Sequence, residues 1–256
     1  MVLNYPTLPS IYFKNKINRL ENKNNSFQNN RILIKNKINY AYGIILENND
    51  KIIHEDYKKA VIKYKEAYKI FLEVKQLCIN NLIYSNSKFD EWFDGKENIN
   101  FKENDIFELY YLSASLGGAI KSSRGNPMDL IYLPKIGKLL KKAITINPKW
   151  NGGSLQSAMM SYTSSRMDLN QDIIKDSVNY YFKNTLEFSD SLDASVFVSY
   201  AEIIYKPEQK KIDFKNTLDY VLSIKTPKNS EFGLQNIIAK KRAKWLLSNM
   251  DDYFIE

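Results

Sequence analysis

The stretch from Phe107 to Arg166 most constrains the fold, because two breaks divide it into three helical segments. Apolar residues recur in it at three- and four-residue spacing, which is typical of helices that bury one face. A Gly-Asn-Pro sequence at 125–127 ends the first segment. Asn147-Pro148 ends the second, since proline disfavours the helical conformation of the residue before it. The stretch therefore predicts packed helices joined by short connections.

The same spacing predicts helices on both sides of this stretch, over residues 32–46, 54–84, 169–189, 191–205, 214–224 and 231–249. Three of the helix ends, near Pro148, Asp190 and Pro227, recur roughly every 40 residues, a period typical of stacked helical hairpins. We expect an all-α, TPR-like array of such hairpins, an α-solenoid or superhelix.

One all-helical domain is expected over residues 31–256. Residues 1–30 are polar and rich in asparagine, and they predict a flexible leader that is extended apart from one short helix near Ile11 to Leu20. Residues 85–105 are acidic and irregular. Their aromatic residues, Trp92 and Phe93, either bind a ligand or fold back onto the domain.

The charge of the chain argues against nucleic acid as a partner. The formal net charge is +8, but lysine carries most of it, and the lysines lie beside glutamates along the helices. This pattern indicates a solvated basic face rather than a surface that grips phosphates through arginine.

Catalytic and metal-binding motifs are missing from the sequence. There is one histidine, His54, and one cysteine, Cys78, which excludes a thiolate-rich metal site. We find no Walker-type loop, no GxGxxG after a strand and no nucleophile elbow. We therefore expect a protein that is not an enzyme and that needs no cofactor or metal.

Two features stand out as candidate sites. Gly117 and Gly118 lie inside a helix, where each costs about 1 kcal/mol relative to alanine, so they either permit a close helix crossing or line a pocket. Glu202 lies in the apolar run VFVSYAEIIY and is either paired between helices or faces a cavity. Close packing and pairing are the favoured interpretations.

Four aromatic residues are candidates for lining an apolar cavity between hairpins, where helical arrays bind peptides or partners. They are Tyr110, Tyr111, Trp150 and Trp245.

Several segments, in order along the chain, resemble the TRAP transporter T-component (TatT) family. They are Tyr40–Gly43, Leu109–Tyr111, Ser113–Ile120, Asn147–Gly153, Ser199–Glu202 with Tyr200, the 214–222 helix, Asn236–Leu247 and Asp251–Phe254. Each is weak alone, but their order and spacing together make the resemblance fairly specific, and it runs from about Tyr40 to Phe254.

The resemblance implies a non-enzymatic accessory component of a TRAP-type solute uptake system. Such a component is expected to self-associate, with a trimer as one candidate size, and to dock the periplasmic solute-binding (P) component. It is also thought to help carry a hydrophobic or organic-acid solute. The alternative is a cytoplasmic TPR-like scaffold that binds a protein segment.

The expected location depends on which argument is used. The resemblance implies a periplasmic protein, with membrane attachment only through a lipid anchor. The sequence shows no signal-peptide pattern near Met1, no apolar run of the ~20 residues that a spanning helix needs, and no lipoprotein cysteine. Taken alone, these observations favour a cytoplasmic protein.

Overall fold

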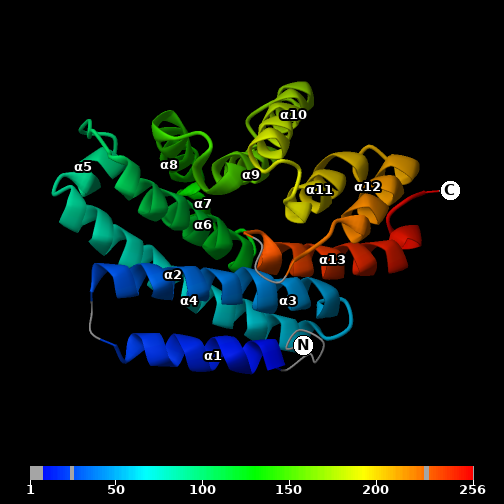
Figure 1. Ribbon diagram of the computed structural model, residues 1–256, viewed down its shortest axis with the longest axis horizontal. Coiled ribbons are helices and arrows are strands. Elements are labelled where there is room, and N and C mark those ends of the chain that lie inside the picture. The colour runs from blue at the N-terminus through cyan, green and yellow to red at the C-terminus, as the bar shows by residue number, and fades with distance from the viewer. Residues whose placement is uncertain (1–7, 24–25, 228–230, 256) are drawn as a thin grey trace. The chain divides into compact units, whose positions relative to one another are not determined.

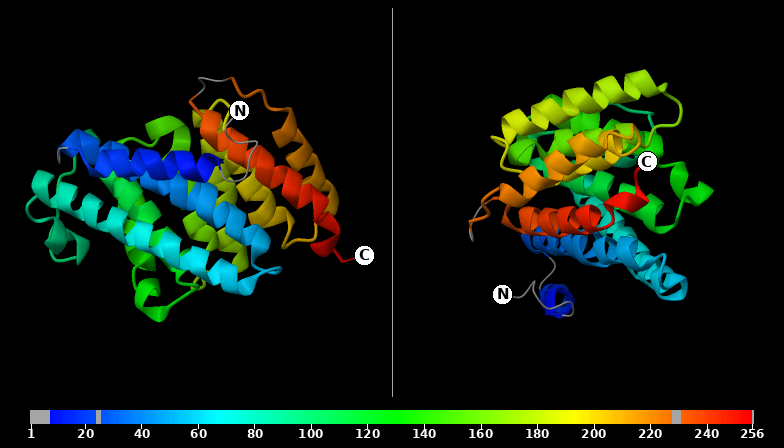
Figure 2. Two further views of the ribbon diagram at one scale, coloured as in Figure 1. Left: turned by 90° about the horizontal axis from the view of Figure 1, so that it is seen from below. Right: turned by 90° about the vertical axis from the view of Figure 1, so that its right-hand side faces the viewer.

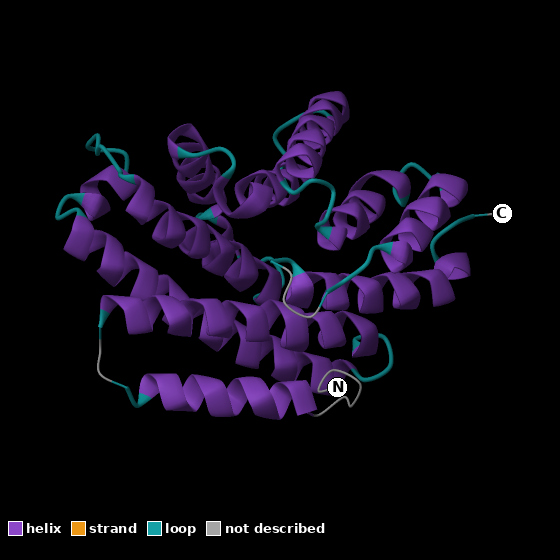
Figure 3. Cartoon of the chain, viewed as in Figure 1, coloured by secondary structure: helices purple, strands orange, loops and turns teal. Residues whose placement is uncertain are grey.

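The computed structural model describes residues 8–23, 26–227 and 231–255. Within these ranges every regular element is a helix and no strand occurs (Figures 1 and 3). The prediction of an all-α protein is therefore confirmed.

The chain divides into two compact units at the proline that the sequence marked as a helix end. Unit 1 is Met1–Asn147 and unit 2 is Pro148–Glu256. Asn147 has extended backbone angles, as expected for a residue before proline, and caps the last helix of unit 1. Each unit has buried apolar side chains of its own.

Unit 1 contains helices from the leader to the second segment of the central stretch. They are α1 (Leu8–Glu21), α2 (Phe27–Tyr40), the π-helical turn η2 (Ala41–Leu46), α3 (Glu47–Ile52), α4 (Tyr57–Ser85), α5 (Phe89–Phe93), the 3-10 turn η3 (Glu103–Asp105), α6 (Ile106–Ser122), α7 (Pro127–Leu130) and α8 (Leu133–Ile146).

Part of the expected leader is helical and packed within unit 1. Helix α1 covers the residues where a short helix was suggested, and it packs against α2 (Figure 1). Phe13, Ile17 and Leu20, spaced four and three residues apart, are buried on one side of α1. Residues 1–7 and 24–25 of the leader lie outside the described residues.

The core of unit 1 is a layer of three consecutive long helices. Helix α6 packs against α4 on one side and against α8 on the other. Leu109, Leu112 and Leu139 are among its fully buried side chains, as the apolar spacing predicts. Burial of such a side chain contributes about 1.5–3 kcal/mol, so each of these leucines stabilises the unit.

A buried ion pair joins the start of this layer to α2. The Arg31 guanidinium donates from Nε to Glu108 Oε1 (2.7 Å) and from Nη2 to Glu108 Oε2 (2.6 Å), and Nη2 also donates to the Asn104 carbonyl. Glu108 accepts a further bond from Asn81 Nδ2 (3.2 Å) and is buried. Because both oxygens of the buried carboxylate are satisfied, the pair fixes α2, α4 and α6 together.

The aromatic residues of the 85–105 connection fold back onto unit 1. Phe89, Trp92, Phe93 and Phe101 are all buried, and their rings contact one another: Phe89 and Phe93 are stacked, and the other pairs are edge-on or tilted. Three lysines of α8 lie over their rings, and one of these, Lys138, has its ammonium 4.3 Å from the Trp92 ring centroid. Lys138 also donates to the Trp92 carbonyl. These contacts join the connection to α8.

Unit 2 contains the remaining helices, several of which pair with their neighbours in the chain. They are α9 (Trp150–Ser164), α10 (Gln171–Phe188), α11 (Ala194–Tyr200), the π-helical turn η4 (Ala201–Tyr205), α12 (Lys211–Ser223), α13 (Gly233–Ser248) and the 3-10 turn η5 (Met250–Asp252). Helix α9 packs on α10, and α13 packs on both α11 and α12 (Figure 2).

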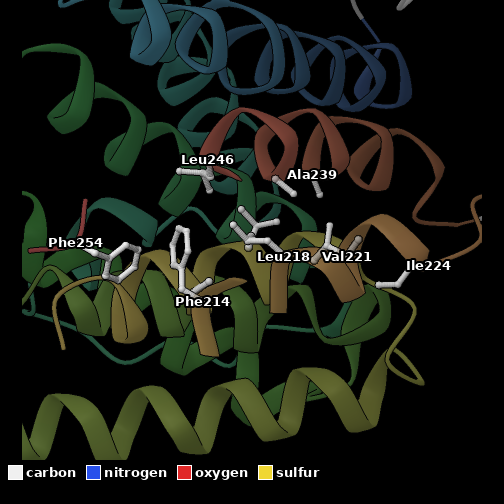
Figure 4. Packing of buried hydrophobic residues seen from close by; sticks show 11 residues of the cluster. Phe214, Leu218, Val221, Ile224, Ala239, Leu246 and Phe254 are labelled. Carbon is white, nitrogen blue, oxygen red and sulfur yellow. The ribbon is translucent and has the colours of Figure 1, made fainter. Parts of the chain in front are cut away.

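One buried cluster holds the C-terminal half of unit 2 together. Figure 4 shows Phe214, Leu218 and Val221 of α12 facing Ala239 and Leu246 of α13, with Phe254 at one end. The small side chain of Ala239 lets the two helices approach closely while the larger residues of α12 fill the space between them.

A buried amide links α13 to the start of α11. Asn236 Nδ2 donates to the Leu192 carbonyl (2.8 Å), and its Oδ1 accepts from the Ala194 amide (2.8 Å). Asn236 thus satisfies two backbone groups next to the helix start, of which the Ala194 amide would otherwise be buried without a partner.

We expect Arg31→Met to lower the free energy of unfolding by about 3 kcal/mol, because it leaves the buried Glu108 carboxylate without its cation. Lys88→Met is the control, since Lys88 is paired with Glu97 on the surface and its loss should leave stability nearly unchanged. Urea unfolding followed by circular dichroism measures both. Equal stability of the two variants would contradict the role assigned to the buried pair.

Candidate functional site

The sequence predicted eight site residues, and the structure places four of them on α6 of unit 1 and four in unit 2. The four on α6 are Tyr110, Tyr111, Gly117 and Gly118. Trp150, Tyr200, Glu202 and Trp245 belong to α9, α11, η4 and α13 of unit 2. The two groups are described separately.

On α6 the glycine pair lies where α4 crosses. A Cβ built on Gly118 would stand 2.3 Å from Cε1 of Phe71, which is inside any real contact distance. The Phe71 ring is fully buried and rests edge-on against Tyr42 with 4.9 Å between ring centroids, so it has little room to move aside. Gly118 therefore permits the close approach of α4 and α6.

Gly117 has looser surroundings than its neighbour. A Cβ there would lie 3.6 Å from the Tyr42 hydroxyl oxygen, an ordinary contact. The Tyr42 hydroxyl donates to the Ala114 carbonyl of α6 (2.8 Å), and burial raises the pKa of Tyr42. This hydroxyl thus satisfies a backbone group of α6 beside the glycine pair.

The two tyrosines of α6 belong to an aromatic cluster near the start of the helix. Tyr111 is buried, with its ring 4.4 Å from that of Phe107 and 5.0 Å from that of Tyr110 between centroids. Burial raises the pKa of Tyr111, so its phenol stays neutral. Tyr111 is a packing residue in this unit, while Tyr110 is more exposed.

Trp150 starts α9 directly before three residues in the left-handed region. Asn151, Gly152 and Gly153 have φ angles of 48°, 59° and 85°. A Cβ on Gly153 would lie 3.2 Å from Cα of Thr185, a backbone atom of α10 that cannot yield. The glycine therefore serves both the turn and the close packing of α9 on α10.

Glu202 forms the clearest polar contact among the predicted residues. It lies in the π-helical turn η4 and accepts from Arg242 of α13, at 2.7 Å from Nη2 and 3.3 Å from Nε. The two side chains are 28% and 15% exposed, so this ion pair is only partly screened by water. Turns of π-helix occur often at functional sites, so the position of Glu202 in η4 makes it a candidate site residue.

Trp245 is joined to Glu202 through the same arginine. The Arg242 guanidinium carbon lies 4.7 Å from the Trp245 ring centroid, and the Trp245 ring lies 6.3 Å from that of Tyr253. The Lys206 ammonium in turn lies 3.6 Å from the Tyr253 ring centroid. We call Glu202, Lys206, Arg242, Trp245 and Tyr253 the Glu202 site.

The Glu202 site thus combines two cations, each over an aromatic ring, with one carboxylate. Burial raises the pKa of Tyr253, and the positive charge of Arg242 partly opposes that rise. The Gln209 side chain holds the last segment in place, donating to the Tyr253 carbonyl (3.1 Å) and accepting from the Ile255 amide (2.9 Å). All five side chains of the site are half-buried.

Tyr200 lies in an aromatic stack next to η4. Its hydroxyl donates to Asn179 Oδ1 of α10 (2.6 Å), and its ring stacks on Phe182 with centroids 4.0 Å apart. It also meets Tyr205 edge-on at 5.1 Å. Burial, with Tyr205 and Glu208 nearby, raises the pKa of Tyr200 to about 12.

Within the described residues, no three His, Cys, Asp or Glu side chains gather where they could hold a metal ion. In the same part of the chain, no helix is both long and apolar enough to cross a membrane.

A family model for the TRAP transporter T-component matches residues 23–254. The chain belongs to the TRAP transporter T-component family. The resemblance seen in the sequence is confirmed. A search of curated proteins found no significant match.

Membership associates this T-component with a TRAP transporter system. The family is one of transporter accessory proteins and not of enzymes. The sequence resemblance included the segments around Tyr200-Ala201-Glu202, Trp245 and Tyr253, which meet in and beside the Glu202 site. Arg242 and Lys206 were not predicted as site residues, because nothing in their spacing shows which rings or carboxylates they face.

We expect Gly118→Ala to destabilise unit 1 by about 1–3 kcal/mol, because the added methyl group overlaps Phe71. Gly117→Ala is the matched control one residue away, where the methyl group fits and removal of a helical glycine gains up to about 1 kcal/mol. Chemical unfolding of both variants measures the difference. A Gly118→Ala variant as stable as Gly117→Ala would show that the α4 and α6 backbones need not approach so closely.

Proposed function

We propose that this chain is a non-enzymatic accessory component that docks the solute-binding P-component of a TRAP-type uptake system. The observation that carries the proposal is the T-component family match over residues 23–254, nearly the whole chain. The fold is consistent with such a role, because an all-helical protein built from packed helix pairs offers broad surfaces for a protein partner.

The Glu202 site is our proposed anchor for that partner. Trp, Tyr and Arg are the residues that most often dominate the binding energy of protein interfaces, and the site presents one of each. The Glu202–Arg242 ion pair and the packing of Arg242 on Trp245 hold these side chains in place before a partner arrives. Because Glu202 neutralises Arg242, the Lys206 cation is the charge of the site that suits an acidic group on the partner.

We extend the proposal to the architecture and assembly that the resemblance implies. The pairing of α9 with α10 and of α12 with α13 supports a TPR-like arrangement of hairpins. We further propose that the chain self-associates, with a trimer as one candidate size, and that it lies in the periplasm. There it would help to pass on a hydrophobic or organic-acid solute.

The purified full chain tests this role by capture of partners from the periplasmic and cytosolic fractions of its own cell. Light scattering gives its oligomeric state, and mass spectrometry identifies the proteins and small molecules that co-purify. An oligomer that captures a TRAP solute-binding protein is the expected result. A monomer that captures only cytosolic proteins would overturn it and favour the cytoplasmic scaffold.

We expect Trp245→Ala to weaken binding of the solute-binding protein by about 2 kcal/mol, the size typical of a central interface residue. Tyr180→Ala removes a 60% exposed aromatic ring elsewhere in unit 2 and should leave the affinity unchanged. Isothermal titration calorimetry measures both. Equal affinities of the two variants would exclude the Glu202 site as the anchor.

A further inference from the structure

Helix α1 lies outside the part of the chain that matches the family. The match begins at residue 23, whereas α1 spans Leu8–Glu21. The helix nevertheless lies along α2 as its antiparallel neighbour, and Figure 2 shows it end-on at the edge of unit 1. The part of unit 1 that matches the family model thus carries a surface that α1 covers.

The apolar part of this contact depends on a few side chains. Phe13, Ile17 and Leu20 of α1 are buried, and the Phe13 ring stacks on Tyr40 of α2 with centroids 6.0 Å apart. Tyr40 itself is only 3% exposed. A stripe at these positions is the pattern by which an amphipathic helix binds a groove.

The Tyr40 hydroxyl links α1 to both α2 and α4. It donates to Glu66 Oε1 of α4 (3.1 Å) and lies 3.0 Å from the Ser10 hydroxyl of α1. Lys14 of α1 forms an ion pair with the same Glu66 oxygen at 3.2 Å. Two polar side chains of α1, Ser10 and Lys14, therefore each have a polar partner on α2 or α4.

Lys37 supplies the second polar link. This lysine of α2 is 5% exposed, and its ammonium lies 2.5 Å from Glu21 of α1 and 2.5 Å from Glu73 of α4. Burial would lower the pKa of Lys37, but its bonds to Glu21 and Glu73 outweigh burial and raise it. If α1 leaves, Lys37 remains paired with Glu73 and becomes exposed to water, so release of α1 leaves no buried charge without a partner.

Helix α1 is also more weakly anchored than the helices of the core. It packs chiefly on α2, and its Ile11 and Tyr12 side chains remain about half exposed. Helix α4, in contrast, contacts α2, α6 and η2 and buries Phe71 completely. Elements with few buried apolar contacts open at lower free energy than the core.

We propose that the face formed by Lys37, Tyr40, Glu66 and Glu73 is a helix-binding surface and that α1 is its releasable occupant. The surface selects an amphipathic helix with an aromatic residue followed at four and seven positions by aliphatic residues. A lysine directly after the aromatic residue reaches Glu66. An acidic residue eight positions after the aromatic residue reaches Lys37. In this structure the chain's own residues 8–21 satisfy that pattern.

A labelled peptide of residues 8–21 tests the proposal against the full chain carrying Phe13→Asp and Ile17→Asp. These substitutions remove α1 from the face, so the peptide should bind saturably in a fluorescence anisotropy titration. The unaltered chain should bind it at least about tenfold more weakly, because a tethered helix competes at high effective concentration. The same peptide with both aspartates should not bind.

Two outcomes of this titration would overturn the proposal. One is failure of the peptide to bind a variant whose urea unfolding remains cooperative, which shows that the rest of the chain is folded. The other is equal binding to both chains, which would place the peptide elsewhere on the protein.

Hydrogen exchange on the unaltered chain gives an independent test that needs no variant. We expect the amides of residues 13–21 to exchange at least about tenfold faster than those of residues 64–82 in α4, through local opening of α1. Exchange of α1 at the same rate as α4 would show that α1 leaves only when the unit unfolds and would overturn its release.

Discussion

The close approach of α4 and α6 at Gly118 is the contact on which unit 1 depends. The Phe71 ring occupies the space that any larger residue at position 118 would need. The crossing fixes the distance between the two helices, and α8 then packs on the other side of α6. The buried pair of Arg31 and Glu108 holds α2 to the same layer. Gly118 thus lowers the local stability of α6, but it permits the close packing that stabilises the whole layer.

Much of the helical pattern could be predicted from spacing and from breaks such as Asn147-Pro148, because burial of one helix face leaves a regular signature in the sequence. The packing of α1 against α2 was less visible, although a short helix near Ile11 to Leu20 was expected. An asparagine-rich composition is typical of flexible leaders, and the amphipathic stripe of α1 consists of only three large apolar residues, Phe13, Ile17 and Leu20. The partner of Glu202 was also hidden, since Arg242 is 40 residues away and only tertiary packing brings the two together.

In unit 2 one helix contributes both to the buried core and to the proposed binding site. Helix α13 contributes Ala239 and Leu246 to the buried cluster and, from its other positions, Arg242 and Trp245 to the Glu202 site. The rigid cluster therefore positions the side chains of the proposed anchor. Pre-positioned aromatic and arginine residues lose little conformational entropy on binding, which suits the docking that we propose for this site.

Solute uptake by cells tests the central claim, a T-component that serves a TRAP transporter, most directly. The gene for this chain is removed, and uptake of the transporter's solute is measured before and after the chain is supplied again. The account predicts that uptake falls on removal, returns with the unaltered chain, and returns only in part with Arg242→Met, which separates Glu202 from Trp245. Uptake that is the same with and without the chain would contradict it.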